Sequence, residues 1–202
     1  IYLLCFSDYH LVSLSCSTYL IMKQFYSLLF LFTCCLSFAQ EKWTTESGQI
    51  NFEASIPLFE EINAESNSAR CIINTKEKNI VCFVKIKDFK FKRDLMQTHF
   101  NEIYLESDKY PRATFKGKIP NLEVDKISSE GTILKMNGIM KIHGVSKTIS
   151  VNGIFKKSKN QLQLVANFVI DTDDFEIKIP SMILPKVSKK VKTQLDFIVE
   201  YN

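Results

Sequence analysis

Few residues of this chain have the types and the spacing that catalysis requires. His143 precedes Gly144 at the end of an alternating apolar run, and Ser146 is near, but no Gly-x-Ser-x-Gly elbow accompanies them. A catalytic histidine needs a nucleophile or a carboxylate partner, and the sequence fixes neither. We expect His143 to point outward or to cap a hairpin by hydrogen bonding, and we predict no catalytic residues and no enzyme activity.

Metal ligands are equally sparse. His99 lies near Asp94 and Glu102, whereas protein metal sites usually need three or four clustered ligands. An acidic cluster is formed by Asp171, Asp173 and Asp174. This cluster lacks the remainder of a calcium-loop pattern, so it is interpreted as a solvated turn and no metal site is predicted.

Two cysteines have the spacing of a cross-strand pair. Cys71 and Cys82 flank the segment CIINTKEKNIVC, which has the pattern of a strand, a polar turn and a second strand. A four-residue loop over 75–78 would place Cys71 directly opposite Cys82 in an antiparallel pair. In an oxidising compartment the two could form a disulfide, and the alternative is two buried thiols.

The elements that must position these residues are mostly strands. Period-two alternation, which is typical of half-buried strands, recurs over 50–58, 80–86, 134–142, 149–155, 162–170 and 191–201. Shorter strand candidates lie at 69–75, 112–119 and 174–179, and 59–68 is expected to be a connection. Alternation fails over 90–110, where apolar residues at helical spacing predict a short helix near 94–101.

About eight long antiparallel strands, each apolar on one face, must bury a common interior as a closed barrel or as a sandwich. The pattern alone does not choose between the two. Small residues on the inward face (Gly138, Gly153 and Ala166) and long strands at 129–142 and 188–202 favour a tall barrel with a cavity. The prediction is one all-β domain over 40–202, an antiparallel eight-stranded lipocalin-like barrel with a short helical insert.

Inward parity on these strands gives the residues expected to line the lumen. They are Phe52, Ile56, Val84, Ile86, Ala113, Phe115, Leu134, Met136, Met140, Ile142, Val151, Phe155, Leu164, Phe168, Phe175, Leu195 and Phe197. The set contains no charged residue and could surround an apolar tunnel. The alternative is that these side chains meet and fill the barrel, as in many small barrels.

The first forty residues have a different pattern. Lys23, an uncharged apolar run over 25–36, and the small residues Ser37 and Ala39 have the layout of a secretory signal peptide over 22–39, with cleavage between Ala39 and Gln40. Residues 1–21 are interpreted as an upstream extension. The alternatives are a longer leader, a membrane anchor over 11–38, and a lipoprotein signal acylated at Cys34 or Cys35. The mature protein is therefore expected to be periplasmic or secreted.

The net charge is +4 and is spread along the chain, so nucleic-acid binding is not expected. A weak attraction to anionic lipid head groups remains compatible with it, and transient membrane contact is an expectation. A lysine run comprises Lys186, Lys189, Lys190 and Lys192. This run is either a solvated face or a site that attracts an anionic head group at the barrel mouth.

Four motifs follow one another in the mature chain: GQINF at 48–52, LMQTHFNE at 95–102 leading into YPRATF at 110–115, GIMKIHGVSK at 138–147, and Asp-Phe-x-Ile at 174–177. In these motifs and in their order, the chain resembles the YceI-like family of secreted polyisoprenoid-binding proteins. The third is similar to the family's Gly-x-Leu-Thr-x-His-Gly-Val-Thr-Lys. The family's Arg-x-Asp-Phe-Gly reads DTDDFE at 171–176, so an arginine and a glycine are missing, which concerns the ligand more than the fold.

The resemblance implies an elongated antiparallel barrel that holds a long-chain isoprenoid or a similar amphiphile in its lumen, with no cofactor apart from such a lipid. The expected function is that of a secreted binding protein that carries or sequesters this ligand. Two alternatives stay open: a stress-related protein-interaction module with a filled barrel, and an enzyme that acts on a lipid intermediate. Neither the ligand's identity nor the oligomeric state follows from the sequence.

Overall fold

The computed structural model describes residues 23–24 and 42–201. The chain divides into two units, Ile1–Gln40 and Glu41–Asn202, and every strand named below belongs to the second. Apart from Lys23 and Gln24, the proposed signal peptide, its cleavage site and the extension before it lie outside the described residues, so these predictions stay predictions. No helix in the described part of the chain combines the length and the apolar character that a membrane-crossing helix needs.

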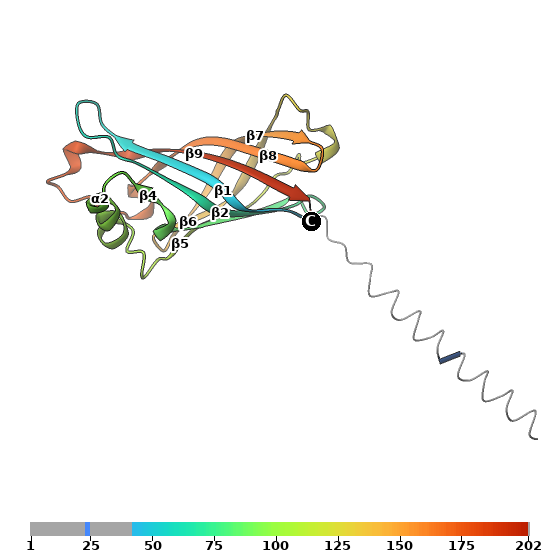
Figure 1. Cartoon of the computed structure of the whole chain (residues 1–202), viewed down its shortest axis with the longest axis horizontal. Helices are drawn as coiled ribbons and strands as arrows, with labels where there is room; N and C mark the ends of the chain where they lie inside the picture. The colour runs from blue at the N-terminus through green and yellow to red at the C-terminus, as the bar shows by residue number, and fades with distance from the viewer. Residues whose placement is uncertain (1–22, 25–41, 202) are drawn as a thin grey trace, which may run out of the picture. The chain divides into compact units, whose positions relative to one another are not determined.

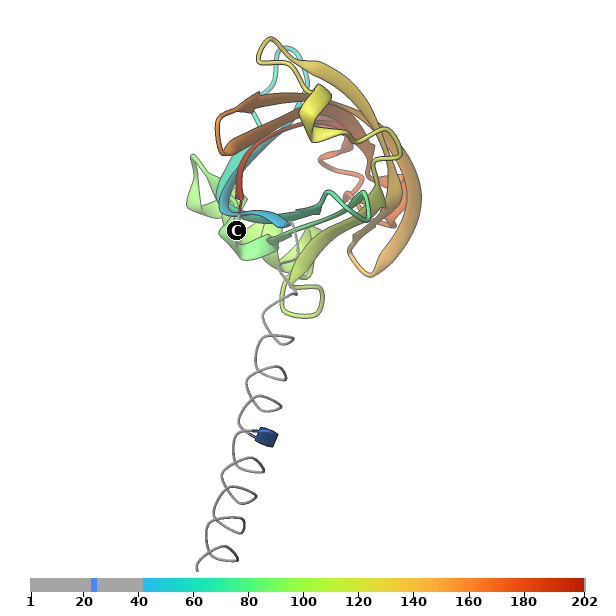
Figure 2. The same cartoon turned by 90° about the vertical axis from the view of Figure 1, so that its right-hand side faces the viewer.

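The described part of the second unit is built around one antiparallel sheet that closes on itself (Figures 1 and 2). Its strands are β1 (Lys42–Ser55), β2 (Asn63–Asn74), β3 (Asn79–Lys85), β4 (Lys90–Phe91), β5 (Arg112–Lys118), β6 (Thr132–Ile142), β7 (Val145–Ser158), β8 (Gln161–Asp171) and β9 (Val187–Tyr201). The order is β1-β9-β8-β7-β6-β5-β3-β2, and β1 pairs with β2 to close the ring, while β4 adds to β2 outside it. The predicted eight-stranded antiparallel barrel is confirmed.

Alternating side chains and tight turns explain why these segments form this sheet. Along β7 the inward Val151 and Phe155 are buried whereas Asn152 and Lys156 are exposed. The β6–β7 turn has two residues, His143 and Gly144, between the paired Ile142 and Val145. Both turn residues have positive φ (50° and 79°), which is the geometry of a type I′ hairpin. A Cβ on Gly144 would lie 2.5 Å from the Tyr110 ring, so only glycine fits there.

The short helices all lie in connections. They are the α-helix α2 (Asp94–His99), which continues as the π-helix η2 (Phe100–Tyr104), and the 3₁₀ helices η1 (Ile86–Asp88), η3 (Val124–Lys126), η4 (Asp173–Phe175) and η5 (Leu184–Lys186). The predicted helix near 94–101 is therefore present and runs slightly longer. Because it contacts β4, the insert packs beside the barrel wall.

Two sequence expectations about strands are wrong. Residues 59–68 are not all connection, since β2 begins at Asn63, and its inward residues Ala64 and Ser66 are too small or too polar to give a visible alternation. Residues 174–179 do not form a strand. There η4 turns the chain, and Glu176 follows with φ 55°, a left-handed geometry that a strand does not adopt.

The small inward residues do not leave open space, contrary to expectation. A Cβ on Gly138 would collide with the backbone oxygen of Lys116, so this glycine lets β5 and β6 approach closely. A Cβ on Gly153 would lie 2.5 Å from Cδ1 of Leu164, whose side chain already occupies the space. Any room inside the barrel must therefore come from elsewhere.

One end of the barrel is filled by a plug. The β5–β6 connection buries Ile119, Leu122 and Ile127, and these pack in one apolar cluster with further buried side chains. Those side chains are Trp43, Leu134, Phe155, Leu162 and Val199. The same end holds the β2–β3 turn, where paired Cys71 and Cys82 form a disulfide near the four-residue loop 75–78. The plug leaves only the opposite end available for an opening.

Candidate ligand-binding cavity

A cavity of about 620 Å³ occupies the barrel beyond the plug. Its wall runs from Leu164 and Phe197 to Phe59 in the β1–β2 loop and Lys186 in η5. Phe59 is 48% exposed, so the cavity opens to the surface at this end, which we call the mouth. The volume lies in the range of pockets that hold small organic ligands.

Most residues predicted by inward parity line this cavity. They are Phe52, Val84, Ile86, Ala113, Phe115, Met136, Met140, Ile142, Val151, Leu164, Phe168, Leu195 and Phe197. On β8 and β9, for example, Leu164 pairs with Phe197, and Leu195 pairs with the buried Ala166. Their positions in the wall are thus established, whereas ligand binding by them stays a prediction.

Four predicted residues lie elsewhere. Leu134 and Phe155 point inward but belong to the plug. Ile56 falls after the end of β1, because Pro57 cannot donate to a strand ladder and the chain turns there. Phe175 lies in η4 and is buried in a second cluster with Ile86, Leu105, Met140, Ile142 and Ile177. None of the four lines the cavity.

The helical insert supplies wall residues that strand parity could not find. They are Met96, His99, Phe100, Tyr104 and Leu105, together with Phe89 and Phe91 before the helix. Phe100 stacks on Phe52 with ring centroids 5.4 Å apart, and Phe89 and Phe91 meet both rings edge-on or tilted. The apolar residues at helical spacing were the available signal, but the sequence did not show which surface the helix covers.

Polar groups in the wall are few and lie at defined depths. Thr193 faces inward opposite Phe168. Thr172 follows Phe168 by four residues, just past the end of β8, which is about 13 Å farther along the strand direction and nearer the mouth. Both side chains line the cavity, both are more than nine-tenths buried, and neither hydroxyl oxygen has a hydrogen-bond partner. Burial also raises the pKa of Tyr104, so its phenol stays neutral.

Charged side chains are confined to the mouth. Glu60 lines it, is 46% exposed and accepts a 2.7 Å contact from Nε of Arg93. Lys186 lines it from η5. The cavity therefore does contain titratable wall residues, which inward parity had not predicted, but the carboxylate lies at the rim and is neutralised by an arginine.

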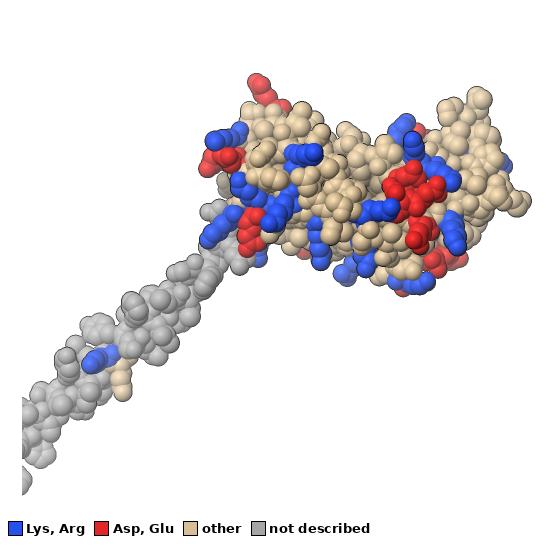
Figure 3. Space-filling model, turned by 180° about the vertical axis from the view of Figure 1, so that it is seen from behind, with Lys and Arg blue, Asp and Glu red and all other residues tan. Residues whose placement is uncertain are grey.

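The lysine run and the acidic cluster turn out to pair with each other and with neighbouring strands. Lys189 contacts Asp173 at 2.8 Å, and this hydrogen bond raises the pKa of Lys189. Lys147 contacts Asp174 at 3.1 Å, while Asp171 accepts a hydrogen bond from the backbone of Asp173. On the face that Figure 3 shows, basic and acidic side chains lie close together in this manner. Asp173 and Asp174 are thus exposed ion-pair partners, and Asp171 holds the start of the η4 turn through its hydrogen bond.

Metal-ligating side chains do not gather within the described residues: no group of three or more histidine, cysteine or acidic residues is placed to hold an ion. His99 and His143 lie on different elements. His143 neither points outward nor caps its own hairpin, because its ring is hydrogen-bonded to the Glu106 side chain and to the backbone oxygen of Phe175. This arrangement ties three segments together outside the cavity.

Comparison with known proteins agrees with this architecture. A family model, the YceI-like domain, matches residues 38–199. A polyisoprenoid-binding domain from Saccharophagus degradans superimposes with a TM-score of 0.72 at 13% identity, covering 81% of this chain and 99% of that one. BcnA from Burkholderia cenocepacia gives 0.61 at 13% identity, covering 75% of this chain and 95% of that one.

No curated protein sequence matches the chain significantly. At 13% identity the two structural likenesses describe the fold, whereas the family model spans most of the chain. It covers all nine strands except the last two residues of β9, and thus includes both the plug and the cavity wall. The chain therefore belongs to the YceI-like family.

Proposed function

We propose that the protein is a secreted or periplasmic binding protein that carries or sequesters a long-chain isoprenoid or a similar amphiphilic lipid. The observation that carries this proposal is the apolar cavity, plugged at one end and open at the other. Each methylene removed from water contributes about 0.8 kcal/mol, so a wall of this kind binds a chain with few polar contacts. The Saccharophagus domain of the same fold is described as polyisoprenoid-binding, which supports the ligand class.

Binding without catalysis fits the chemistry of the wall. An enzyme acting on a lipid intermediate needs a nucleophile or a base near the reacting atom. In the described wall, Glu60 is held by Arg93 at the rim, and His99 and Tyr104 come from the helical insert. The inward-facing strand residues of the wall are apolar apart from Thr193, so no nucleophile stands beside a base there. The open cavity also favours a carrier over an interaction module with a filled barrel.

The proposal extends to transient membrane contact, because a lipid of this class resides in a bilayer before and after transport. It extends equally to a location beyond the cytoplasm, where the signal peptide over 22–39 would send the mature chain. There a lipid chain needs a shield from water.

The test is to identify what the barrel holds. The mature chain, purified without detergent, is extracted with organic solvent and the extract is analysed by mass spectrometry. Delipidated protein is then titrated with a fluorescent prenyl chain. A co-purified lipid and saturable uptake at one site per chain are expected. Repeated absence of lipid, together with no uptake, would overturn the proposal.

A further inference from the structure

Two loops flank the cavity mouth, and the strand residues at which they begin and end pair with each other. The β1–β2 loop (56–62) starts after Ser55, and β9 starts at Val187, which pairs with Ser55. In Figure 1 this loop and the connection from β8 to β9 extend at the same end of the barrel. The tips of both loops therefore project beside the opening.

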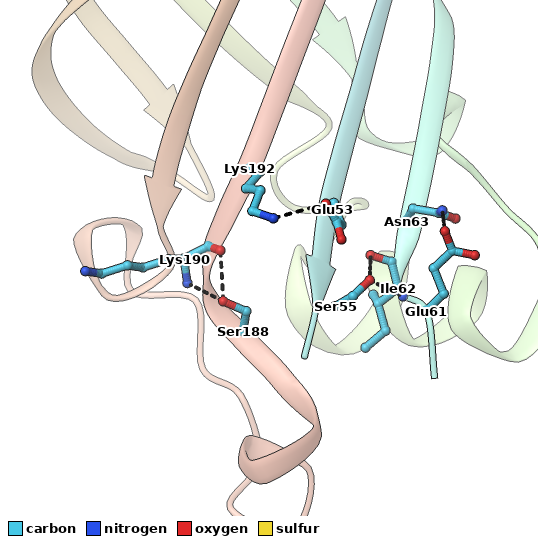
Figure 4. A network of polar contacts seen from close by, with 8 residues as sticks. All are labelled: Glu53, Ser55, Glu61, Ile62, Asn63, Ser188, Lys190 and Lys192. Atoms are coloured by element: carbon cyan, nitrogen blue, oxygen red, sulfur yellow. Dashed lines mark hydrogen bonds and ion pairs between the residues drawn. The ribbon is translucent and has the colours of Figure 1, made fainter. Parts of the chain in front are cut away.

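Serine hydroxyls fix the bases of these loops (Figure 4). The backbone N–H of Ile62 donates to Oγ of Ser55 at 2.9 Å, which closes the β1–β2 loop. On the other side, Oγ of Ser188 accepts from the backbone of Lys190 at 3.1 Å. Farther from the loop tips, higher in Figure 4, Lys192 contacts Glu53 at 3.5 Å across the β9–β1 pair. The loops are thus held in place, and their tips are presented to solvent.

The tip of the β1–β2 loop carries a leucine where a turn favours glycine. Leu58 has φ 74° and follows Pro57, and the backbone N–H of Phe59 donates to the oxygen of Ile56 at 3.2 Å. This is the third position of a type II turn, which normally takes glycine or asparagine. The Leu58 side chain is fully exposed and packs on nothing that would offset the backbone strain. Fold stability does not account for a leucine there.

The connection from β8 to β9 also carries an exposed apolar side chain, since Met182, between η4 and η5, is 86% exposed. Leu95 of α2 is exposed as well, on the helical insert near the mouth. Such side chains, on separate tips around an opening, do not form the flat continuous face that a protein partner buries. They suit insertion into a soft apolar medium.

The lysines without an ion pair around the mouth favour contact with an anionic surface. The acidic residues Glu53, Glu60, Glu61, Asp173 and Asp174 are each engaged by a basic partner. Within the described residues, Lys178, Lys186 and Lys190 have no such ion pair. Acids without one at this end include Asp94 and Glu102 on the helical insert, and Asp171 and Glu176 on either side of η4. Asp171 already accepts a backbone hydrogen bond. Lys178 and Lys186 lie on the connection that carries Met182, and Lys190 lies near the start of β9.

We propose that the protein docks on bilayers with anionic head groups through its cavity mouth, inserting Leu58 and Met182 while Lys178, Lys186 and Lys190 contact the head groups. This inference rests on the proposed carrier function and names the surface at which the ligand is exchanged. Docking in this orientation brings the cavity opening onto the membrane, so a lipid chain passes between the two without crossing water.

Flotation with phosphatidylglycerol-containing vesicles tests the inference. The double variant Leu58→Gly with Met182→Ser removes the apolar side chains from both loop tips, and neither residue lines the cavity. Ile133→Ser is the matched control, because Ile133 is a similarly exposed apolar residue (69%) at the start of β6, near the plug. Burying one such side chain corresponds to about a tenfold change in partitioning. We expect at least a tenfold loss for the double variant and less than a twofold change for Ile133→Ser.

Misfolding does not explain such a loss, because glycine suits φ 74° and Leu58→Gly should unfold at no lower denaturant concentration. Uptake of the fluorescent chain from solution should also be unchanged. Wild-type binding by the double variant, or equal loss in Ile133→Ser, would overturn the inference and leave the carrier function standing. Equal binding to vesicles of neutral lipid would overturn the part assigned to the lysines. A dimer that the same substitutions dissolve would overturn docking in favour of self-association.

Discussion

Nε2 of His143, in the β6–β7 turn, lies 2.8 Å from Oε2 of Glu106, just after the helical insert. The other ring nitrogen lies 3.3 Å from the backbone oxygen of Phe175 in η4. The ring is 13% exposed and meets Tyr110 edge-on at 4.7 Å. One imidazole therefore ties the insert and the β8–β9 connection to a rigid hairpin, and both tied segments border the cavity.

Replacing His143 with alanine should lower the free energy of unfolding by about 1–3 kcal/mol, because two partly buried contacts are lost together. Urea denaturation measures the change. His143→Asn separates the contribution of the ring contacts from that of the backbone geometry, because asparagine tolerates φ 50° but does not reach both partners. Non-additivity with Glu106→Gln is expected, and strictly additive losses would show that the pair is not coupled.

The disulfide between Cys71 and Cys82 closes a short loop, so it should contribute about 2–3 kcal/mol to stability. A Cys71→Ala, Cys82→Ala double variant should lose that amount in urea denaturation. Adding a reductant should shift the wild-type protein toward the variant and leave the variant unchanged. A wild-type transition that does not respond to reductant under unfolding conditions would mean that the bond does not form in solution.

The strand positions could be predicted, and so could thirteen of the residues that line the cavity, because parity is a local signal. Phe168, for example, lies on the same face of its strand as Leu164, four residues away. Once one of them is assigned to the interior, the other must also point inward. The same reasoning places Cys71 opposite Cys82, once the loop 75–78 sets the register. These inferences need only neighbours in the sequence.

Depth along the barrel could not be predicted in this way. Leu134 and Phe155 point inward, as parity requires, yet they meet Ile119 and Leu122 because a distant connection folds across that end. Parity reports which face a side chain takes, not what lies opposite. The insert is a similar case: its helix was visible in the sequence, whereas the contact of Phe100 with Phe52 depends on tertiary packing.

The hydroxyl of Thr193 should destabilise the empty protein, since it is buried without a hydrogen-bond partner. Thr193→Val removes the hydroxyl at similar volume and should raise the free energy of unfolding of delipidated protein by about 1 kcal/mol. Thr148→Val, at an exposed site on β7, is the control and should have little effect.

The same substitution reports on the ligand. If the hydroxyl bonds an oxygen of the bound lipid, wild-type protein should prefer a long-chain alcohol to the hydrocarbon of equal length, and Thr193→Val should reduce that preference about fivefold or more. Lower stability of Thr193→Val without lipid would mean instead that water already satisfies the hydroxyl. An unchanged preference would mean that the lipid oxygen lies elsewhere.

Filling the cavity should abolish uptake without unfolding the barrel. Ala113 lines the wall on β5 and pairs with Val84, so Ala113→Trp projects an indole into the space that a chain would occupy. Uptake of the fluorescent prenyl chain should fall at least tenfold, while circular dichroism keeps its β-sheet form. The cost of overpacking should be at the low end of about 1–3 kcal/mol, because the indole enters a space that is already there. Lys116→Trp, exposed on the same strand, controls for the added ring and should bind normally. Full uptake by Ala113→Trp would place the lipid outside this cavity, and loss in both variants would indicate a perturbed strand.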